Sequence, residues 1–132
     1  MIAGGSRIAY YLAKSLEESG IRSTIIEKDE ETCTMLAGLL PKATIIHGDA
    51  SDHSVLDSED LEDYDAFVSL TGIDEINMVS SIMARQKKIP TVVTKLKRKN
   101  QCIDRFIGSW FCDFSKGSCI NAYCSLCTCN SE

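Results

Sequence analysis

Apolar residues follow two alternating patterns along the first hundred positions of the chain. Short runs rich in β-branched residues indicate buried strands at residues 23–27, 43–46, 66–70 and 91–96. A further apolar stretch at the start of the chain breaks at Gly4-Gly5 and reads as the end of a strand followed by a tight turn. The sequence thus predicts five strands, and the stretches between them have a different spacing of apolar residues.

The intervening stretches have helical spacing. They predict helices over residues 6–19, 30–40, 54–61 and 74–88. The residues expected to face inward are Ile8, Ala9, Leu12, Ala13 and Leu16 in the first helix, Cys33, Leu36, Ala37 and Leu40 in the second, and Met78, Val79, Ile82 and Met83 in the last. Regular strand–helix alternation at spacings suited to right-handed crossovers predicts an α/β fold, a Rossmann-like doubly wound parallel sheet.

Length and charge limit the alternatives. A chain of 132 residues has room for one domain with a core. The net charge of −5 argues against a nucleic-acid partner, which requires a basic face. No apolar run approaches the roughly 20 residues needed to span a bilayer, and the start of the chain lacks the features of a secretory signal. We therefore expect a cytoplasmic protein that does not itself span a membrane.

The last quarter of the chain differs from the rest. Residues 107–132 have no sustained period, so the domain is predicted to cover residues 1–106 and to be followed by an irregular, cysteine-rich C-terminal tail. In a reducing compartment a disulfide framework is not favoured. The spacing Cys124-x-x-Cys127-x-Cys129, with Cys119 upstream, is compatible with zinc, but a second pair or a nearby histidine is missing. An unstructured tail without a metal is the favoured interpretation.

The turn between the first strand and helix is the first candidate for chemistry. The glycine positions one, three and six of a dinucleotide fingerprint hold Gly4, Ser6 and Ala9. Gly4 suits the tight turn and Ala9 permits close packing, whereas the Ser6 side chain narrows the approach of a pyrophosphate. A helix N-terminus here would favour phosphate. An ordinary strand–helix turn is the alternative.

Polar residues at later strand ends support a nucleotide site. Glu27 lies 23 residues after Gly4, where an acid accepts from adenosine ribose hydroxyls. Its carboxylate also repels a 2′-phosphate, which favours NAD(H) or an adenine nucleotide over NADP(H). Two further strands end in Gly48-Asp49-Ala50-Ser51 and Thr71-Gly72. Because ligands of open α/β sheets bind at the carboxyl ends of the strands, we expect these turns to meet at one crevice.

Longer motifs extend this picture. They are IAGGSRIAYYLAKSLE, TIIEKD, GDASD followed by Val55-Leu56, TGIDEINMVSSIMA and TVVTKLKRK. Through them residues 1–105 resemble the NAD-binding domain of the Trk-type potassium-uptake regulators, TrkA-like proteins with the RCK/KTN fold. GDASD and the D-E-x-N-M run are more specific signals than the glycine turn.

The resemblance implies a regulator and not an enzyme. Such domains bind NAD(H) or ATP/ADP on the cytoplasmic side of the membrane, form homo-oligomers through their Rossmann sheets, and couple ligand occupancy to a membrane potassium-transport subunit. The residues that match the family's binding positions are Gly4, Gly5, Ser6, Arg7 and Ile8 (phosphate loop), Glu27 (ribose), Asp49 and Ala50 (adenine), Thr71 and Gly72 (phosphate or second nucleoside), and Lys95 (a basic contact).

The sequence is also compatible with other functions. A fragment of an NAD-dependent oxidoreductase would require a substrate domain and a positioned proton donor. Tyr10-x-x-x-Lys14 matches the catalytic pair of short-chain dehydrogenases but lies in the first helix, where that geometry is implausible. The short first strand and the unusual tail also suggest a truncated or frame-shifted reading frame, with a nonfunctional paralogue as a third interpretation.

Overall fold

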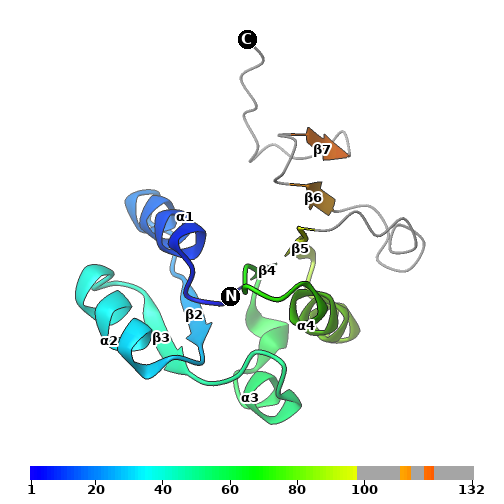
Figure 1. Cartoon of the computed structure of the whole chain (residues 1–132), viewed down its shortest axis with the longest axis horizontal. Coiled ribbons are helices and arrows are strands. Elements are labelled where there is room, and N and C mark those ends of the chain that lie inside the picture. Colours follow the sequence, from blue (N-terminus) through cyan, green and yellow to red (C-terminus); the bar gives the residue numbers. More distant parts are fainter. Residues whose placement is uncertain (98–110, 114–117, 121–132) are drawn as a thin grey trace.

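The fold is built around a single sheet, seen in a computed structural model that describes residues 1–97, 111–113 and 118–120. Its strands are β1 (Ile2–Ala3), β2 (Thr24–Glu27), β3 (Thr44–His47), β4 (Ala66–Ser69), β5 (Thr91–Lys95), β6 (Phe111–Asp113) and β7 (Ser118–Ile120). The spatial order is β3-β2-β1-β4-β5-β6-β7 (Figure 1). All neighbours are parallel except β6 and β7, which pair antiparallel. The predicted Rossmann-like parallel sheet is confirmed.

Helices cover both faces of this sheet. They are α1 (Arg7–Glu18), α2 (Glu30–Leu39), α3 (His53–Asp57), the short 3-10 helix η1 (Leu61–Asp63) and α4 (Asp74–Gln86). Helices α1 and α2 lie on one side of the sheet, and α3 and α4 lie on the other (Figure 1). One buried cluster joins α1 and α2 to Ile2 and Ile25, and the other joins α3 and α4 to Phe67 and Val92. The order of strands reverses direction between β1 and β4, so the carboxyl ends of these two strands form the switch point at which such sheets bind ligands.

Helix α1 packs on the sheet mainly through small residues. Ala9 and Ala13 are fully buried, and Leu12 and Leu16 pack against the same cluster. The prediction for Ile8 was wrong, because its side chain is 36% exposed. The two alanines let the helix axis approach the strands closely, so the stripe of contact is narrow and Ile8 falls outside it. In α2 the inward residues are Cys33, Leu36 and, at its C-cap, Leu40, whereas Ala37 is exposed.

Helix α4 departs further from the expected pattern. Val79 and Ile82 are 45% and 42% exposed, so their predicted inward orientation was wrong. The buried face of α4 instead contains Asn77, Ser80, Ser81, Met83 and Ala84. The serines are accommodated because their hydroxyl groups bond to strand residues: Ser80 Oγ lies 2.9 Å from Ser69 Oγ, and Thr94 Oγ1 donates to Ser81 Oγ over 2.6 Å.

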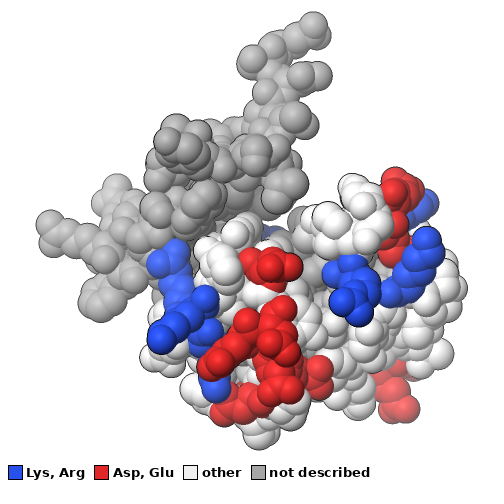
Figure 2. Space-filling view, turned by 180° about the vertical axis from the view of Figure 1, so that it is seen from behind, with Lys and Arg blue, Asp and Glu red and all other residues white. Residues whose placement is uncertain are grey.

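The segment between β3 and β4 is less helical than expected. A helix was predicted over residues 54–61, but α3 ends at Asp57. Asp60 has a left-handed backbone, with φ of 43°, which interrupts the helix before η1 begins. Six acidic residues lie within positions 57–65 of this segment. Figure 2 shows acidic side chains gathered over it beside basic ones, and Lys87 Nζ lies 2.7 Å from Asp57 Oδ1.

In the tail the structure describes β6 and β7 only, and the boundary predicted at residue 106 lies outside the described residues. The same is true of Cys124, Cys127 and Cys129, on which the zinc alternative depends. Within the described part, no three His, Cys, Asp or Glu side chains are grouped so that they could hold a metal ion. None of the helices described is both long enough and apolar enough to cross a membrane.

Candidate functional site

A cleft of about 300 Å³ opens at the carboxyl ends of β1, β2, β3 and β4. Its lining residues are Gly4, Gly5, Ser6, Ile26, Glu27, Lys28, Thr32, Gly48, Asp49, Ala50, Leu70, Thr71, Gly72, Ile73 and Ile76. The cleft therefore lies at the switch point of the sheet, and the strand-end turns predicted to meet do line the same cavity.

Two glycines form the wall next to β1, and each is required by its surroundings. Gly4 has φ of +98°, and an added Cβ would lie 2.9 Å from the Thr71 Cα. At Gly5 an added Cβ would lie 2.8 Å from Leu36 Cδ1 and 2.9 Å from Glu27 Oε2. The positive φ and the close approach of backbone to β4 exclude a side chain at Gly4, and close contacts with two side chains disfavour one at Gly5.

The N-terminus of α1 forms the adjacent wall. Ser6 is the N-cap of this helix, and its Oγ accepts from the N–H of Ala9 over 3.4 Å. The residue that departs from the fingerprint is thus engaged in capping. The N–H groups of Arg7 and Ile8 belong to the first turn, where no helical carbonyl can accept from them. The side chains of Arg7 and Ile8 are exposed and do not line the cleft.

The carboxylate of Glu27 is fixed at the end of β2 by backbone donors. Its Oε2 accepts from the N–H of Gly5, and its Oε1 accepts from the N–H groups of Lys28 (2.8 Å) and Asp29 (2.9 Å). The side chain is therefore preoriented toward the glycine turn, and it lines the cleft. A carboxylate held here can accept from hydroxyl groups of a bound ribose.

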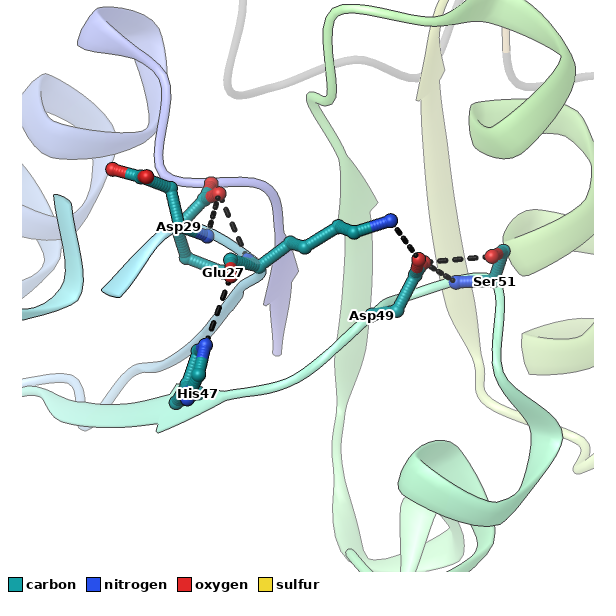
Figure 3. A network of polar contacts seen from close by, with 6 residues as sticks. Glu27, Asp29, His47, Asp49 and Ser51 are labelled. Atoms are coloured by element: carbon teal, nitrogen blue, oxygen red, sulfur yellow. Dashed lines mark hydrogen bonds and ion pairs between the residues drawn. The ribbon is translucent and has the colours of Figure 1, made fainter. Parts of the chain in front are cut away.

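A second polar network links β2 to the loop after β3 (Figure 3). Lys28 Nζ lies 2.9 Å from Asp49 Oδ2, and Asp49 Oδ1 accepts from the N–H of Ser51 (2.9 Å) and its hydroxyl (2.6 Å). His47 Nε2 lies 2.9 Å from the Lys28 carbonyl oxygen. Hydrogen bonds from Ser51, followed by the contact with the Lys28 ammonium, lower the pKa of Asp49 to about 2, so this carboxyl is charged at neutral pH.

The opposite wall, after β4, is organised by a residue to which the sequence analysis assigned no role. Asn77 is fully buried in α4. Its Oδ1 accepts from the N–H (2.9 Å) and the hydroxyl (2.6 Å) of Thr71, and its Nδ2 donates to the carbonyls of Thr71 (3.2 Å) and Lys95 (2.9 Å). An asparagine inside an otherwise regular helical pattern was the available signal, because it is a weak helix former.

The lysine that was predicted to make a basic contact with the ligand is not among the residues that line the cleft. Lys95 is half-buried in β5 and does not line the cleft. Lys97 is the lysine that reaches this wall: its Nζ donates to the Gly72 carbonyl over 3.2 Å, and its N–H donates to Asp74 Oδ2 over 2.9 Å. Strand β5 ends at Lys95, so counting alternate positions along a strand does not reveal that Lys97 turns toward Gly72.

Of the residues predicted to bind a ligand, eight line the one cleft: Gly4, Gly5, Ser6, Glu27, Asp49, Ala50, Thr71 and Gly72. Three do not, namely Arg7, Ile8 and Lys95. The apolar lining contributed by Ile26, Leu70, Ile73 and Ile76 was not predicted as part of the site. The arrangement offers a carboxylate, a helix N-terminus and an apolar surface side by side, which are the groups needed for a nucleoside phosphate.

Comparison with known proteins agrees with this geometry. The family model described as TrkA-N domain matches residues 1–104. The chain belongs to the TrkA-N family. The TrkA-N domain is a Rossmann-type nucleotide-binding domain, so the match accounts for both the order of the strands and the position of the cleft.

Curated relatives carry the name of a transport system. The chain is 41% identical over 86 residues to "Trk system potassium uptake protein TrkA" of Haemophilus influenzae, covering 65% of this chain and 19% of that protein. It is 38% identical over 96 residues to the protein of the same name from Halomonas elongata, covering 70% and 21%. A "Trk system potassium uptake protein TrkA homolog" of Methanothermobacter thermautotrophicus is 34% identical over 96 residues, covering 73% and 44%.

The TrkA-N chain thus spans about a fifth of the length of the first two relatives and less than half of the third. The names of these three relatives describe potassium uptake, and none of them names an enzyme. What is shared with them is the domain that contains the cleft.

Proposed function

We propose that this TrkA-N chain binds an adenine nucleotide, NAD(H) or ATP/ADP, and regulates a potassium-uptake transporter according to the occupancy of its cleft. The observation that carries the proposal is the position of Glu27, whose carboxylate is held by the Gly5 N–H beside the N-terminus of α1. A ribose acceptor and a phosphate seat are thereby placed next to each other, as a nucleotide requires.

Each part of the nucleotide has a matching surface in the cleft. The ribose hydroxyls lie on Glu27, the adenine lies beside Asp49 and Ala50, and the phosphates lie between the N-terminus of α1 and Thr71-Gly72. The cavity of about 300 Å³ is at the lower end of the range for small-molecule pockets. It suits the adenosine half of a dinucleotide or a single adenine nucleotide.

Regulation follows from linkage between two sites. A nucleotide shifts a transporter between states only by the difference between its affinities for those states. The relatives are named as potassium-uptake proteins, which supports a membrane potassium-transport subunit as the partner. We place the chain on the cytoplasmic face of the membrane, peripheral to that subunit, and assembled as a homo-oligomer through its Rossmann sheets.

The cleft favours a regulator over a dehydrogenase fragment. In the part of the chain that the structure describes, the titratable residues that line the cleft are Glu27, Lys28 and Asp49, and each is engaged by partners within the chain. Asp49, whose pKa is lowered to about 2, does not hold a proton to donate at neutral pH. Hydride transfer from NADH to any member of a panel of small carbonyl compounds would overturn this part of the proposal.

Calorimetry of the purified chain with NAD⁺, NADH, ATP and ADP tests nucleotide binding. We expect at least one of the four to bind, and Glu27→Ala to weaken it by about tenfold or more, because a hydrogen bond to a charged group contributes roughly 1.5–3 kcal/mol. Glu27→Gln removes the charge and keeps one acceptor oxygen for the Gly5 N–H, but its amide nitrogen replaces the acceptor of the Lys28 and Asp29 N–H groups. Urea denaturation of both variants therefore accompanies the calorimetry, to separate loss of the ribose contact from a disturbed turn.

Glu31→Ala is the matched control, because Glu31 is an exposed acid in the first turn of α2 outside the cleft. It should leave the affinity unchanged. Unaltered affinity in both Glu27 variants would contradict the ribose contact, and absence of binding by all four ligands would contradict the nucleotide site itself.

A further inference from the structure

The residue that follows the ribose acid is a cation, and it is paired across the mouth of the cleft. Lys28 leaves the end of β2, and Asp49 lies in the loop after β3. Their side chains form an ion pair with 2.9 Å between Nζ and Oδ2, and both residues line the cleft (Figure 3). The pair therefore lies on the side of the cleft where Glu27 accepts the ribose.

Asp49 is held in the orientation that this ion pair needs. Ser51 donates both its N–H and its hydroxyl to Oδ1, which leaves Oδ2 directed to Lys28. These contacts lower the pKa of Asp49 to about 2, so the carboxylate is charged at every pH near neutrality. Lys28 accordingly faces a fixed negative group before any ligand arrives.

We propose that Asp49 is a specificity-determining residue, which occupies the Lys28 ammonium and so makes the cleft reject nucleotides that carry a 2′-phosphate. The inference rests on the proposed nucleotide function of the same cleft. A 2′-phosphate is accommodated in Rossmann domains by a basic side chain close to the ribose. Lys28 follows Glu27 directly and could supply that charge. Its ammonium, however, is already paired with the Asp49 carboxylate.

The charges around the ribose add to this effect. Among the described residues that line the cleft, Glu27 and Asp49 carry carboxylates and Lys28 carries a positive charge. A 2′-phosphate carrying close to two negative charges would meet the Glu27 carboxylate directly and would have to displace Asp49 to reach Lys28. An unmodified ribose meets no such penalty, because its hydroxyls donate to Glu27.

The expected size of the effect is modest. The Lys28 side chain is 78% exposed and that of Asp49 is 31% exposed, so solvent screens the pair. Exposed ion pairs contribute up to about 1 kcal/mol, which corresponds to a change of roughly fivefold. Glu27 repels a 2′-phosphate in every variant that keeps it, so removing Asp49 changes the preference without reversing it.

The test is the ratio of NADP⁺ to NAD⁺ affinity, measured by calorimetry on the 132-residue chain and on four variants. Asp49→Asn should raise this ratio about threefold to fivefold. The amide oxygen can still accept from Ser51, so the loop is retained while the charge is removed. Lys28→Ala combined with Asp49→Asn should abolish the gain, because the released ammonium is what attracts the phosphate, and Lys28→Ala alone completes the double-mutant cycle.

Asp52→Asn is the charge-matched control. Asp52 lies three residues further on, bonds to Ser54 at the N-terminus of α3 and does not line the cleft. Asparagine caps helices as well as aspartate does, so this variant should fold and leave the ratio unchanged.

The outcomes separate the two proposals. A wild-type chain that binds neither NAD⁺ nor NADP⁺ nor an adenine mononucleotide would overturn the nucleotide function and this inference with it. Nucleotide binding with an unchanged ratio in Asp49→Asn, an equal rise in Asp52→Asn, or a rise that persists without Lys28 would overturn the inference alone.

Discussion

The backbone N–H of Gly5 donates to the Glu27 carboxylate, which joins the turn before α1 to the end of β2 through a single side chain. The carboxylate that marks a ribose site is therefore also part of the scaffold that shapes the phosphate seat. A substitution at Glu27 therefore changes both the ribose acceptor and the support of the turn. A substitution at Gly5 changes the position of the Glu27 carboxylate. Because of this hydrogen bond, a loss of nucleotide affinity in either variant has to be compared with its loss of stability.

Gly5→Ala should weaken both binding and stability. The added Cβ would lie 2.8 Å from Leu36 Cδ1 and 2.9 Å from Glu27 Oε2, so these side chains must shift. Overpacking of this kind reduces the free energy of unfolding by about 1–3 kcal/mol. Urea denaturation measures the stability, and calorimetry measures the nucleotide affinity.

The matched control is Gly38→Ala in α2, where an added Cβ would meet nothing within 4 Å. Replacing this helical glycine should increase the free energy of unfolding by roughly 0.5–1 kcal/mol. If both variants behaved alike, the close contacts of Gly5 with Leu36 and Glu27 would be of no consequence.

Asn77→Ala should lower the free energy of unfolding by about 2–4 kcal/mol. The substitution removes the side-chain partner of the Thr71 N–H and of the Lys95 carbonyl, two hydrogen bonds that are partly buried. Leaving a buried group unsatisfied costs roughly 1–3 kcal/mol. Amide hydrogen exchange at Thr71 should accelerate at the same time. Gln86→Ala, at an exposed position of the same helix, should have almost no effect.

Ser51→Ala should raise the pKa of Asp49 from about 2 toward its ordinary value, because the hydrogen bond from the Ser51 hydroxyl is the largest single cause of the shift. Lys28→Ala should also raise it, because this variant removes the hydrogen bond and the positive charge that Lys28 supplies. Carboxyl carbon chemical shifts followed by NMR across an acid titration report this pKa directly. An unchanged Asp49 titration in Ser51→Ala would contradict the hydrogen bond from the Ser51 hydroxyl to Asp49 Oδ1.

The same shift has a defined sign for stability. The pKa of Asp49 is lower in the folded chain than in the unfolded one, so its stabilising contribution is present above about pH 4 and is lost as the pH falls toward 2. Ser51→Ala should therefore reduce the difference in stability between neutral and acidic pH. Urea midpoints at pH 7 and pH 3 measure this difference.

Met83 and Ile82 should differ sharply although they are neighbours in α4. Met83→Ala removes a buried side chain and should lower the free energy of unfolding by roughly 2–5 kcal/mol. Ile82→Ala removes a side chain that is 42% exposed and should lower it by well under half as much. Comparable losses in the two variants would favour the inward orientation that the sequence pattern predicts for Ile82.

The sequence predicts the sheet because its strands are short, β-branched and separated by stretches with helical spacing. It predicts less about which helix residues face inward. In α4 the rule that apolar residues lie inside fails, because Ser80 and Ser81 have hydroxyl partners on the strands and the helix packs closely. Such partners lie 11 and 13 positions away in sequence, beyond any local pattern.

Prediction of the cleft lining from the sequence succeeds where a residue lies at or just after the end of a strand, as Glu27 and Thr71 do. It fails where the arrangement depends on the path of the chain after the strand. Lys97, rather than Lys95, reaches Gly72 for this reason. The Lys28–Asp49 pair joins residues 21 positions apart, and only the register of β2 against β3 brings them together.

The amide of Asn77 binds the carbonyl of Thr71 and the carbonyl of Lys95 through the same nitrogen. The Thr71 carbonyl belongs to the turn that lines the cleft, and the Lys95 carbonyl lies at the end of β5. A displacement of the turn is therefore either shared by the end of β5 or accompanied by the rupture of one of these partly buried hydrogen bonds. The Asn77 side chain thus couples the position of the cleft turn to the position of the end of β5.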